Sequence, residues 1–426
     1  MLITEMNKEQ LTAFKAECEK AYTEYKARGL KLDMSRGKPG AEQIEISMPI
    51  FNALKDADNL LAEDGSDVRN YGLLTGIPEA KKLFAELLGV SENETIIGGN
   101  SSLQLMYDSI ARAMQFGVVG SERPWNKEDK IKFLCPAPGY DRHFAICELF
   151  GIEMITIPMN SDGPDMDMIE KLVSKDASIK GIWCVPLYSN PDGIVYSDDV
   201  VRRFGNLSPK APDFRIFWDN AYCVHHLTNN HHTILNILEE CKKNNKANMV
   251  YIFASTSKIS FPGSGVSVMA ASEENVKSIT KLLGISIISY DKINQLKHAR
   301  YFKNLDGIMA HMEKLKASLA PKFNLVLEKL DTQLSELGIL DWVKPEGGYF
   351  VSVNTIDGCA KRVVSLLKDA GVVMTGAGAT FPYGKDPSDK NIRIAPTYPP
   401  LDELSVAMDL FCLCVKLASA EKLLSE

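Results

Sequence analysis

Short β-rich runs alternate with helical stretches of ten or more residues between about residues 95 and 270. The runs are rich in Val, Ile, Phe and Trp, and the stretches between them have the spacing of helices. This alternation predicts an α/β fold with a mainly parallel, seven-stranded sheet. The seven runs are ETIIGG, KFLCP, EMITIP, GIWCVP, FRIFWD, MVYIFAS and GVSVMAAS.

The pattern changes at both ends of the chain. Residues 7–28 have apolar and aromatic positions at helical spacing, and Gly29 then ends the run as a helix C-cap would. Beyond residue 305 we expect a long helix, a strand in EGGYFVSV, a further helix, a Gly-rich loop and a last helix from about residue 401. The resulting predicted domains are an N-terminal helix and arm that packs with the small domain, a large α/β domain, and a small α+β domain, over 1–55, 56–304 and 305–426.

Composition narrows the class of protein. The chain has 426 residues, 45% of them apolar and 24% charged, which is typical of a folded globular protein. A net charge of -7, without a Lys/Arg-rich run, argues against nucleic acid as a partner. The start of the chain lacks the pattern of an export signal, and no apolar run approaches the roughly 20 residues that cross a bilayer. Nine cysteines without a CxxC pair fit reduced, buried thiols, so we expect a cytoplasmic protein without membrane contact.

Candidate chemistry lies where the predicted strands end, because ligands of parallel sheets bind beyond the carboxyl ends of the strands. Lys258 follows MVYIFA, Asn190 follows GIWCVP, and Asp219 ends FRIFW with Tyr222 three residues later. Each has an ordinary alternative explanation as a solvated loop lysine, a turn residue or a capping carboxylate. Taken together they place an amine, a carboxylate and two neutral hydrogen-bonding groups at one edge of the sheet.

Two further segments offer charge complementarity. The stretch IIGGNSSLQ (96–104) passes from a strand through glycines into a helix, a geometry that binds anions, and Asn100, Ser101 and Ser102 lie at its turn. A simple helix N-cap explains this stretch equally well. Arg393 lies in an apolar, strand-like stretch of the small domain, where its charge requires a partner; an internal salt bridge is the alternative to a bound carboxylate.

This set of groups matches what pyridoxal 5'-phosphate (PLP) chemistry requires. A lysine amine forms a Schiff base with the cofactor, and a carboxylate keeps the pyridine nitrogen protonated so that the ring accepts electrons. Asn190 and Tyr222 can donate hydrogen bonds to the ring phenolate, and the anion site can take the phosphate. Arg393 can bind the carboxylate of a substrate bidentately. We therefore predict a PLP enzyme in which Lys258 holds the cofactor and Asp219 contacts the ring nitrogen.

The same residues occur in motifs that resemble class I aminotransferases of PLP fold type I. Six motifs follow in the order of that family, from about Asp33 to the C-terminal helix: YGLLTGIP (71–78), GGNSS, NPDG, DNAY, STSK and NIRI. The wording of SRGKP (35–39), PGYDRH (138–143), NQLKH (294–298) and ATFPYGKD (379–386) looks like the bacterial aspartate aminotransferase branch often described as MocR-like.

The resemblance implies a ping-pong transfer of an amino group from an amino acid, best guessed as aspartate, to 2-oxoglutarate. Lys258 would move the proton at the substrate's Cα as general base and acid. The resemblance also implies a homodimer in which Tyr71 reaches the cofactor phosphate of the neighbouring subunit. It implies substrate contacts from Asn190, Arg393 and the SRGKP motif, in which Arg36, Gly37 and Lys38 lie.

The chain departs from the family's pattern at three places. Val266 stands where many relatives have an arginine for the phosphate, and we expect Ser255 and Ser257 to compensate. Ala137 stands where the ring-stacking aromatic is usual, so we expect Tyr140 to stack instead. The distal carboxylate of a dicarboxylic substrate has no obvious partner; the candidate cations are Arg36, Lys292, Lys297 and Arg300.

Other functions were weighed against this interpretation. STSK and YSN match two motifs of penicillin-binding serine hydrolases, but in the wrong order and without KTG. An aminotransferase-like regulator lacks room for a DNA-binding helix-turn-helix before the first motif. Two histidine pairs, at 225–226 and 231–232, lack neighbouring metal ligands in the sequence, so we expect no metal, and the 376–378 loop lacks a dinucleotide fingerprint. A PLP-dependent lyase or decarboxylase would use the same residues and stays open.

Overall fold

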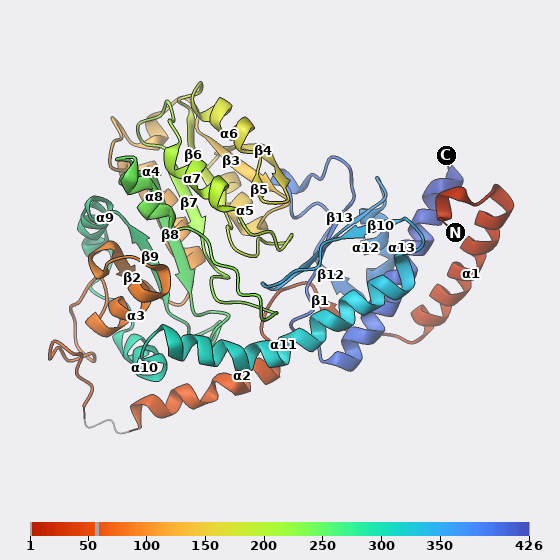
Figure 1. The fold of residues 1–426 in the computed structure, drawn as a ribbon, viewed down its shortest axis with the longest axis horizontal. Helices are drawn as coiled ribbons and strands as arrows, with labels where there is room; N and C mark the ends of the chain where they lie inside the picture. Colours follow the sequence, from red (N-terminus) through yellow and green to blue (C-terminus); the bar gives the residue numbers. More distant parts are fainter. Residues whose placement is uncertain (1, 56–58, 426) are drawn as a thin grey trace.

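A large mixed sheet and two smaller sheets organise the chain, which we describe from a computed structural model for residues 2–55 and 59–425 (Figure 1). The large sheet has the strand order β2-β9-β8-β7-β6-β3-β4-β5. Strands β8, β7, β6, β3 and β4 run parallel, whereas β9 and β5 pair antiparallel with their neighbours. The strands are β2 (Thr95–Ile97), β3 (Lys132–Ala137), β4 (Glu153–Asn160), β5 (Gly163–Pro164), β6 (Ile179–Cys184), β7 (Arg215–Asp219), β8 (Val250–Ser255) and β9 (Ser267–Ala271).

The predicted α/β class is therefore confirmed, with a mainly parallel sheet formed by all seven predicted runs. The additional eighth strand, β5, is only two residues long and too short to leave a periodic signal. The helices of this part are α3 (Pro78–Leu88), α4 (Ser102–Phe116), α5 (Asp141–Leu149), α6 (Met166–Val173), α7 (Asp198–Asn206), α8 (Ile237–Lys243), α9 (Glu273–Ser286) and α10 (Lys292–Phe302).

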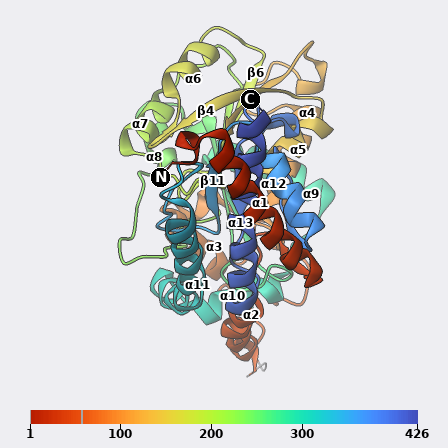
Figure 2. The ribbon, with the colours of Figure 1, turned by 90° about the vertical axis from the view of Figure 1, so that its right-hand side faces the viewer.

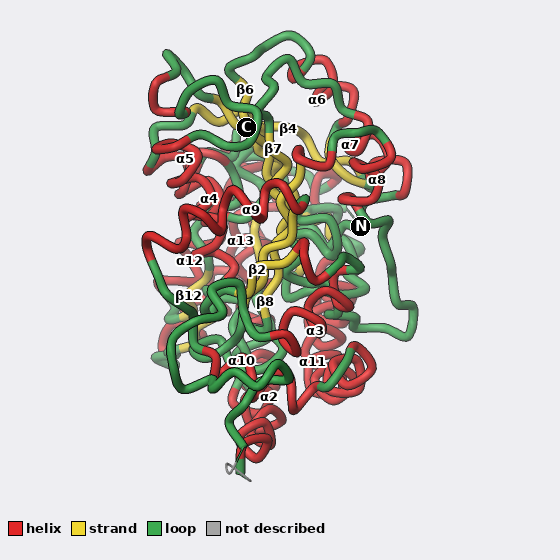
Figure 3. The backbone as a smooth tube through the Cα atoms, turned by 90° about the vertical axis from the view of Figure 1, so that its left-hand side faces the viewer, coloured by secondary structure: helices red, strands yellow, loops and turns green. Residues whose placement is uncertain are grey.

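Both faces of the large sheet are buried. Along β7, Ile216 and Trp218 belong to the apolar cluster on one face, and Phe217 belongs to the cluster on the other. The first cluster also contains residues of α6, α7 and α8, and the second contains residues of α4, α5 and α9. Figure 3 shows the strands running between these two layers of helices. Every residue of β7 and β9 is thus buried, whereas β4 near the sheet edge is partly exposed.

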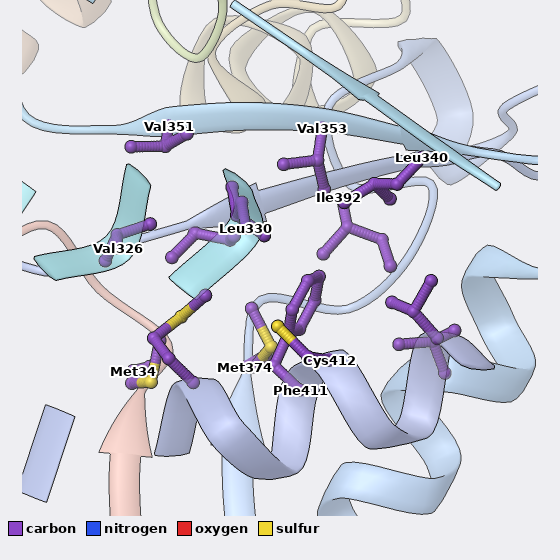
Figure 4. Close-up of a cluster of buried hydrophobic side chains, with 14 of the residues drawn as sticks. Met34, Val326, Leu330, Leu340, Val351, Val353, Met374, Ile392, Phe411 and Cys412 are labelled. Atoms are coloured by element: carbon purple, nitrogen blue, oxygen red, sulfur yellow. The ribbon is translucent and has the colours of Figure 1, made fainter. Parts of the chain in front are cut away.

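The small domain is built on a three-stranded antiparallel sheet, β10 (Leu340–Trp342), β11 (Val351–Thr355) and β13 (Asn391–Ile394), in the order β10-β11-β13. Its helices are α11 (Leu305–Leu334), α12 (Ala360–Asp369) and α13 (Leu401–Ser425). Val326, Leu330, Val353, Ile392 and Phe411 interlock in its core (Figure 4).

The N-terminal segment packs on this small domain. Helix α1 (Lys8–Ala27) lies along α13 (Figure 2), and β1 (Leu32–Met34) pairs in parallel with β12 (Val372–Met374). Helix α2 (Ala41–Ser47) follows and contacts α11. Gly29 ends the first helical region with a φ of 61°, as its sequence position predicts. The proposed division at 55/56 stays a prediction, because residues 56–58 lie outside the described part of the chain.

Removing the Phe411 side chain tests the core of the small domain. Phe411 is fully buried, so Phe411→Ala leaves a cavity and is expected to lower the free energy of unfolding by about 3–5 kcal/mol in urea denaturation. Phe116, which is 64% exposed, provides the matched control. Phe116→Ala should change the free energy of unfolding by about 0.5 kcal/mol or less. Equal effects of the two substitutions would contradict the assignment of Phe411 to the core.

Candidate active site

Lys258, Asp219 and Asn190 gather at the carboxyl edge of the large sheet. Asp219 is the last residue of β7, Lys258 follows the end of β8 by three residues, and Asn190 follows β6. Because β6, β7 and β8 are parallel neighbours, their following loops meet at one edge. The structure thus brings together three of the residues selected from the sequence.

Lys258 lies in an aromatic pocket. Its Nζ lies 4.8 Å from the ring centre of Tyr222 and 5.8 Å from that of Tyr349. Burial lowers the pKa of Lys258; the negative charge of Asp219 opposes this shift, and the positive charge of Arg393 adds to it. Such an amine gives up its proton more readily than a surface lysine, which suits a nucleophile or a general base.

Asp219 is buried and only half satisfied. Its Oδ2 lies 3.1 Å from Nε2 of His143, whereas Oδ1 is buried without a hydrogen-bond partner among the described residues. His143 in turn stacks on Trp183, with ring centres 4.4 Å apart and planes at 8°. One oxygen of the carboxylate is therefore held by His143, whose ring is packed on Trp183. The other oxygen remains available to a positively charged or N–H group.

His143 was not selected as a site residue from the sequence. It lies in α5 two residues after Asp141, within the PGYDRH motif that entered only through its resemblance. The polar side chain of a buried helix face was the available signal, but only the tertiary fold reveals that it faces Asp219. Trp183 was missed for the same reason, because its strand pattern indicates core packing.

Arg393 projects from β13 of the small domain towards the edge of the large sheet. Its Nη1 donates to Oδ1 of Asp141 and to Oδ1 of Asn190, each at 3.1 Å, and Nη2 lies 3.3 Å from Oγ1 of Thr375. The guanidinium also lies 4.7 Å from the ring centre of Phe350, and its buried Nε has no partner among the described residues. The internal salt bridge considered from the sequence is therefore present, and it lies at the candidate site.

The SRGKP motif contributes one close contact. A Cβ atom added to Gly37 would lie 2.4 Å from Cζ of Phe350, so the backbone of Gly37 rests directly on the ring that supports Arg393. Lys38 differs from expectation, since its Nζ lies over the ring of Tyr398 at 3.7 Å. Arg36 is exposed to solvent. The geometry thus connects Gly37 more closely than its two neighbours to Arg393.

The glycine turn before α4 and the loop after β8 meet. Oγ of Ser257 donates to the carbonyl oxygen of Asn100 at 2.8 Å, and Oγ of Ser255 donates to Oγ of Ser257 at 3.1 Å. Ser101 is the N-cap residue of α4, but its side chain makes no capping hydrogen bond, and Ser102 is the first helical residue. Hydroxyls and helix N–H groups therefore converge where an anion can bind.

Val266 is 1% exposed and lies in the apolar cluster beneath the sheet edge. Its backbone N–H donates to Oγ1 of Thr256 at 2.9 Å. The departure from the family's arginine is thus accommodated by ordinary packing.

The two tyrosines differ in their surroundings. Tyr140 is the N-cap residue of α5, and its ring meets that of His143 edge-on at 4.9 Å. Burial raises the pKa of Tyr140 to about 12. Tyr222 is also buried, which raises the pKa of its phenol, and it stacks with Tyr349 at 6.2 Å between ring centres. Both phenols are thus neutral hydrogen-bonding groups at physiological pH.

Three of the cations considered for a distal carboxylate have other partners. Lys292 Nζ donates to the carbonyl oxygens of Asn70 and Gly72. Lys297 Nζ lies 4.8 Å from the ring centre of Phe51, and Arg300 Nη2 donates to the carbonyl oxygen of Asn59 at 2.8 Å. Sequence reasoning could not place these groups, because their partners are backbone carbonyls and a ring distant along the chain. Tyr71, in contrast, is 79% exposed.

Other site types find little support in the described residues. No group of three or more His, Cys, Asp or Glu side chains there has an arrangement that could hold a metal ion. None of the helices in residues 2–55 and 59–425 is long and apolar enough to span a bilayer.

The chain matches one protein family along nearly its whole length. The sequence model of the aspartate amino-transferase family matches residues 6–426. Aspartate aminotransferase of Corynebacterium glutamicum is 46% identical over 98% of this chain and 96% of its own. A crystal structure of an aspartate transaminase from that organism has a TM-score of 0.96 at 45% identity, covering 99% of both chains.

A more distant structure resembles the chain in fold alone. It is the α-aminoadipate aminotransferase of Thermus thermophilus, complexed with N-(5'-phosphopyridoxyl)-L-leucine. It has a TM-score of 0.73 at 19% identity and covers 94% of this chain and 95% of its own.

The contact between Gly37 and Phe350 can be tested by adding one methyl group. Gly37→Ala places Cβ inside the contact distance of a ring that is only 6% exposed, so we expect the free energy of unfolding to fall by about 1–3 kcal/mol. Gly376→Ala is the matched control, because nothing lies within 4 Å of its added Cβ. Unfolding in urea that is unchanged by Gly37→Ala would contradict this close packing.

Proposed function

The chain belongs to the aspartate aminotransferase family, and from this we propose that Lys258 holds PLP covalently while the enzyme moves an amino group from aspartate to 2-oxoglutarate. The observation that carries this proposal is the buried cluster at the sheet edge. It combines a desolvated amine, a carboxylate with one unpaired oxygen and an oriented guanidinium.

The residues of the cluster fit the cofactor. Oδ1 of Asp219 is a buried acceptor in need of a donor, as a protonated pyridine nitrogen would be. The uncommitted hydroxyl of Ser101 and the start of α4 suit the phosphate, together with Asn100, Ser102, Ser255 and Ser257. We assign Tyr140 to the ring face, because its aromatic side chain contacts His143, which supports Asp219.

When bound, PLP supplies a ring that accepts electrons from the substrate's Cα. Once the incoming amine of the substrate has displaced it from the cofactor, Nζ of Lys258 would take the proton from that Cα, and its lowered pKa increases the fraction of free amine available to do so. Asp219 would hold a positive charge at the ring nitrogen, and His143 fixes the orientation of its carboxylate. Tyr222 lies beside Lys258, and Asn190 accepts a hydrogen bond from Arg393; from these positions both would donate to the phenolate oxygen of the cofactor ring.

Arg393 is proposed to bind the α-carboxylate of the amino acid. Its guanidinium is already oriented by Asn190 and Phe350, so a carboxylate can bind a planar fork that is held in place. Because Gly37 has no side chain, its backbone can lie against the ring of Phe350 beside Arg393. We propose that Arg36 and Lys38 of the same motif also contact the substrate.

Aspartate as donor rests on the C. glutamicum relative, which is named an aspartate aminotransferase and matches almost the full chain. A ping-pong cycle follows, in which the first oxo acid leaves before 2-oxoglutarate receives the amino group. We also propose that the enzyme works in the cytoplasm, a location supported by nine free cysteines.

We further propose a homodimer in which Tyr71 reaches the active site of the partner subunit. A tyrosine that is 79% exposed is unusual for a residue in a family motif, and a partner would cover it. Phe51 and Leu61 are also exposed, at 53% and 42% of their surface. Both contact side chains of α10.

A panel of amino acids tests the donor specificity. In single half-reactions, aspartate should convert the visible absorbance of the lysine-bound cofactor into that of its amine form, whereas neutral amino acids should react at least tenfold more slowly. The reason is that a second carboxylate adds charge-assisted binding. Release of ammonia or CO2 with no oxo acid formed would overturn transamination in favour of a lyase or decarboxylase.

Lys258→Ala should abolish the visible absorbance band of the attached cofactor, because no other amine is proposed to form that bond. Lys281→Ala, an exposed position on α9, is the control and should retain the band. Spectra of the two purified variants after addition of PLP are sufficient. A band that survives Lys258→Ala would refute the assignment.

Asp219→Asn should lower kcat about 10²–10³-fold in coupled assays, because a neutral amide does not hold a positive charge at the ring. The exposed carboxylate of Asp129 provides a matched Asp129→Asn control, which should keep the parental kcat. A kcat that is unchanged by Asp219→Asn would argue against contact between Asp219 and the cofactor.

A further inference from the structure

Helix α10 carries an unusual number of buried polar side chains. Polar groups in the interior require partners, since an unpaired one costs free energy. Four of these side chains have partners in two separate segments of the chain, and the fifth, Lys297, lies over the ring of Phe51. The buried polar residues are Lys292, Asn294, Gln295, Lys297 and His298.

One side of α10 holds the loop that follows β8. Nδ2 of Asn294 donates to the carbonyl oxygens of Ser264 and Gly265 at 3.2 and 2.9 Å. Nε2 of His298, one helical turn later, lies 2.8 Å from Oγ of Ser260. This side therefore fixes the loop that begins at the proposed cofactor-binding lysine.

The other side of α10 holds the segment around Tyr71. The ammonium of Lys292 donates to the carbonyl oxygens of Asn70 and Gly72, the residues on either side of Tyr71. Three residues further along α10, Oε1 of Gln295 accepts from the backbone N–H of Ile77 at 3.0 Å. The segment is thus fixed at Tyr71 itself and at the start of α3.

Lys292 is placed at some energetic cost. It is 3% exposed, and among residues 2–55 and 59–425 no carboxylate lies within 4 Å of its ammonium. The charge of Lys292 contributes to lowering the pKa of Asp67, but Asp67 forms its ion pair with Arg69, with Oδ2 2.7 Å from Nη2. Among the described residues its hydrogen-bond partners are therefore two backbone carbonyl oxygens, and the buried charge of Lys292 fixes their orientation.

The backbone near Tyr71 requires such support. Gly72 and Leu73 have positive φ values of 105° and 56°, so regular secondary structure does not define the path. The side chain of Tyr71 is exposed and cannot orient itself by packing within its own chain. The direction of its phenol then depends on the two flanking carbonyl groups, both of which Lys292 binds.

We propose that Lys292 is a positioning residue that aims Tyr71 at the cofactor phosphate in the partner subunit. This inference rests on the proposed function, in which Tyr71 crosses to the partner's site. It has a distinctive consequence. A substitution at Lys292 should weaken cofactor binding in the neighbouring subunit's site and leave the site of its own subunit intact.

Heterodimers of defined composition test this consequence. Two differently tagged chains are co-expressed, and the mixed dimer is isolated by sequential affinity steps. In the first arrangement one chain carries both Lys258→Ala and Lys292→Met, and its partner is unsubstituted. In the second, one chain carries Lys258→Ala and the other carries Lys292→Met. Each heterodimer then has a single Lys258, so the visible band during titration with PLP reports one site.

The two arrangements contain the same two substitutions, but their dissociation constants for PLP should differ. In the first, the remaining Lys258 is served by Tyr71 of the chain with Lys292→Met, and the dissociation constant for PLP should rise about tenfold or more, as expected for a misaligned hydrogen bond to a charged group. In the second, Tyr71 comes from a chain with intact Lys292, and the dissociation constant should equal that of a heterodimer with Lys258→Ala alone. Any general loss of stability would appear equally in both.

Equal dissociation constants in the two arrangements, or weaker binding in the second, would overturn the role of Lys292. A parallel pair with Tyr71→Phe in place of Lys292→Met separates the inference from its premise. If Tyr71→Phe shows the difference between arrangements and Lys292→Met does not, only the inference fails. If Tyr71→Phe shows none, or if light scattering finds the parent chain monomeric, the intersubunit role of Tyr71 fails and the inference with it.

Discussion

Burial of the central sheet on both faces is the constraint that decides where this protein can do chemistry. Phe217 packs on one side of β7 and Ile216 and Trp218 pack on the other, so the charged residues of this strand, Arg215 and Asp219, stand at its two ends. Asp219, a charged residue, is found at the point where the strand ends. The parallel direction of β6, β7 and β8 then brings the residues after three strands to one edge. The amine, the carboxylate and the amide meet there as a consequence of topology.

That constraint also explains what the sequence could predict. Strands rich in apolar residues can be located in the sequence, and few polar residues follow them, so position made Lys258, Asp219 and Asn190 candidates and their combination indicated the chemistry. The order of the motifs added the fold and the family. His143 and Trp183 could not be found in this way, because each lies within an element whose pattern indicates packing, and their contact with Asp219 arises from the tertiary arrangement.

The cations were the least predictable part. Lys292, Lys297 and Arg300 were candidates for binding a distal carboxylate, yet two of them bind backbone carbonyls and one lies over a ring. A backbone carbonyl leaves no trace in the sequence, and its direction depends on φ and ψ values of a segment such as 70–73. The partners of long cationic side chains are therefore settled only when the path of the whole chain is known.

The contacts of Arg393 have a consequence for how ligands enter. The guanidinium is hydrogen-bonded to Asp141 and Asn190, so its buried charge has partners within the chain. In the proposed role of Arg393, an arriving carboxylate would compete with the carboxylate of Asp141 for the guanidinium, and the net gain in free energy would be the difference between two similar ion pairs. Such a site would hold an acid in a defined orientation without binding it tightly. Weak binding allows fast release, which suits an enzyme whose two half-reactions must each release an acidic product before the next can begin.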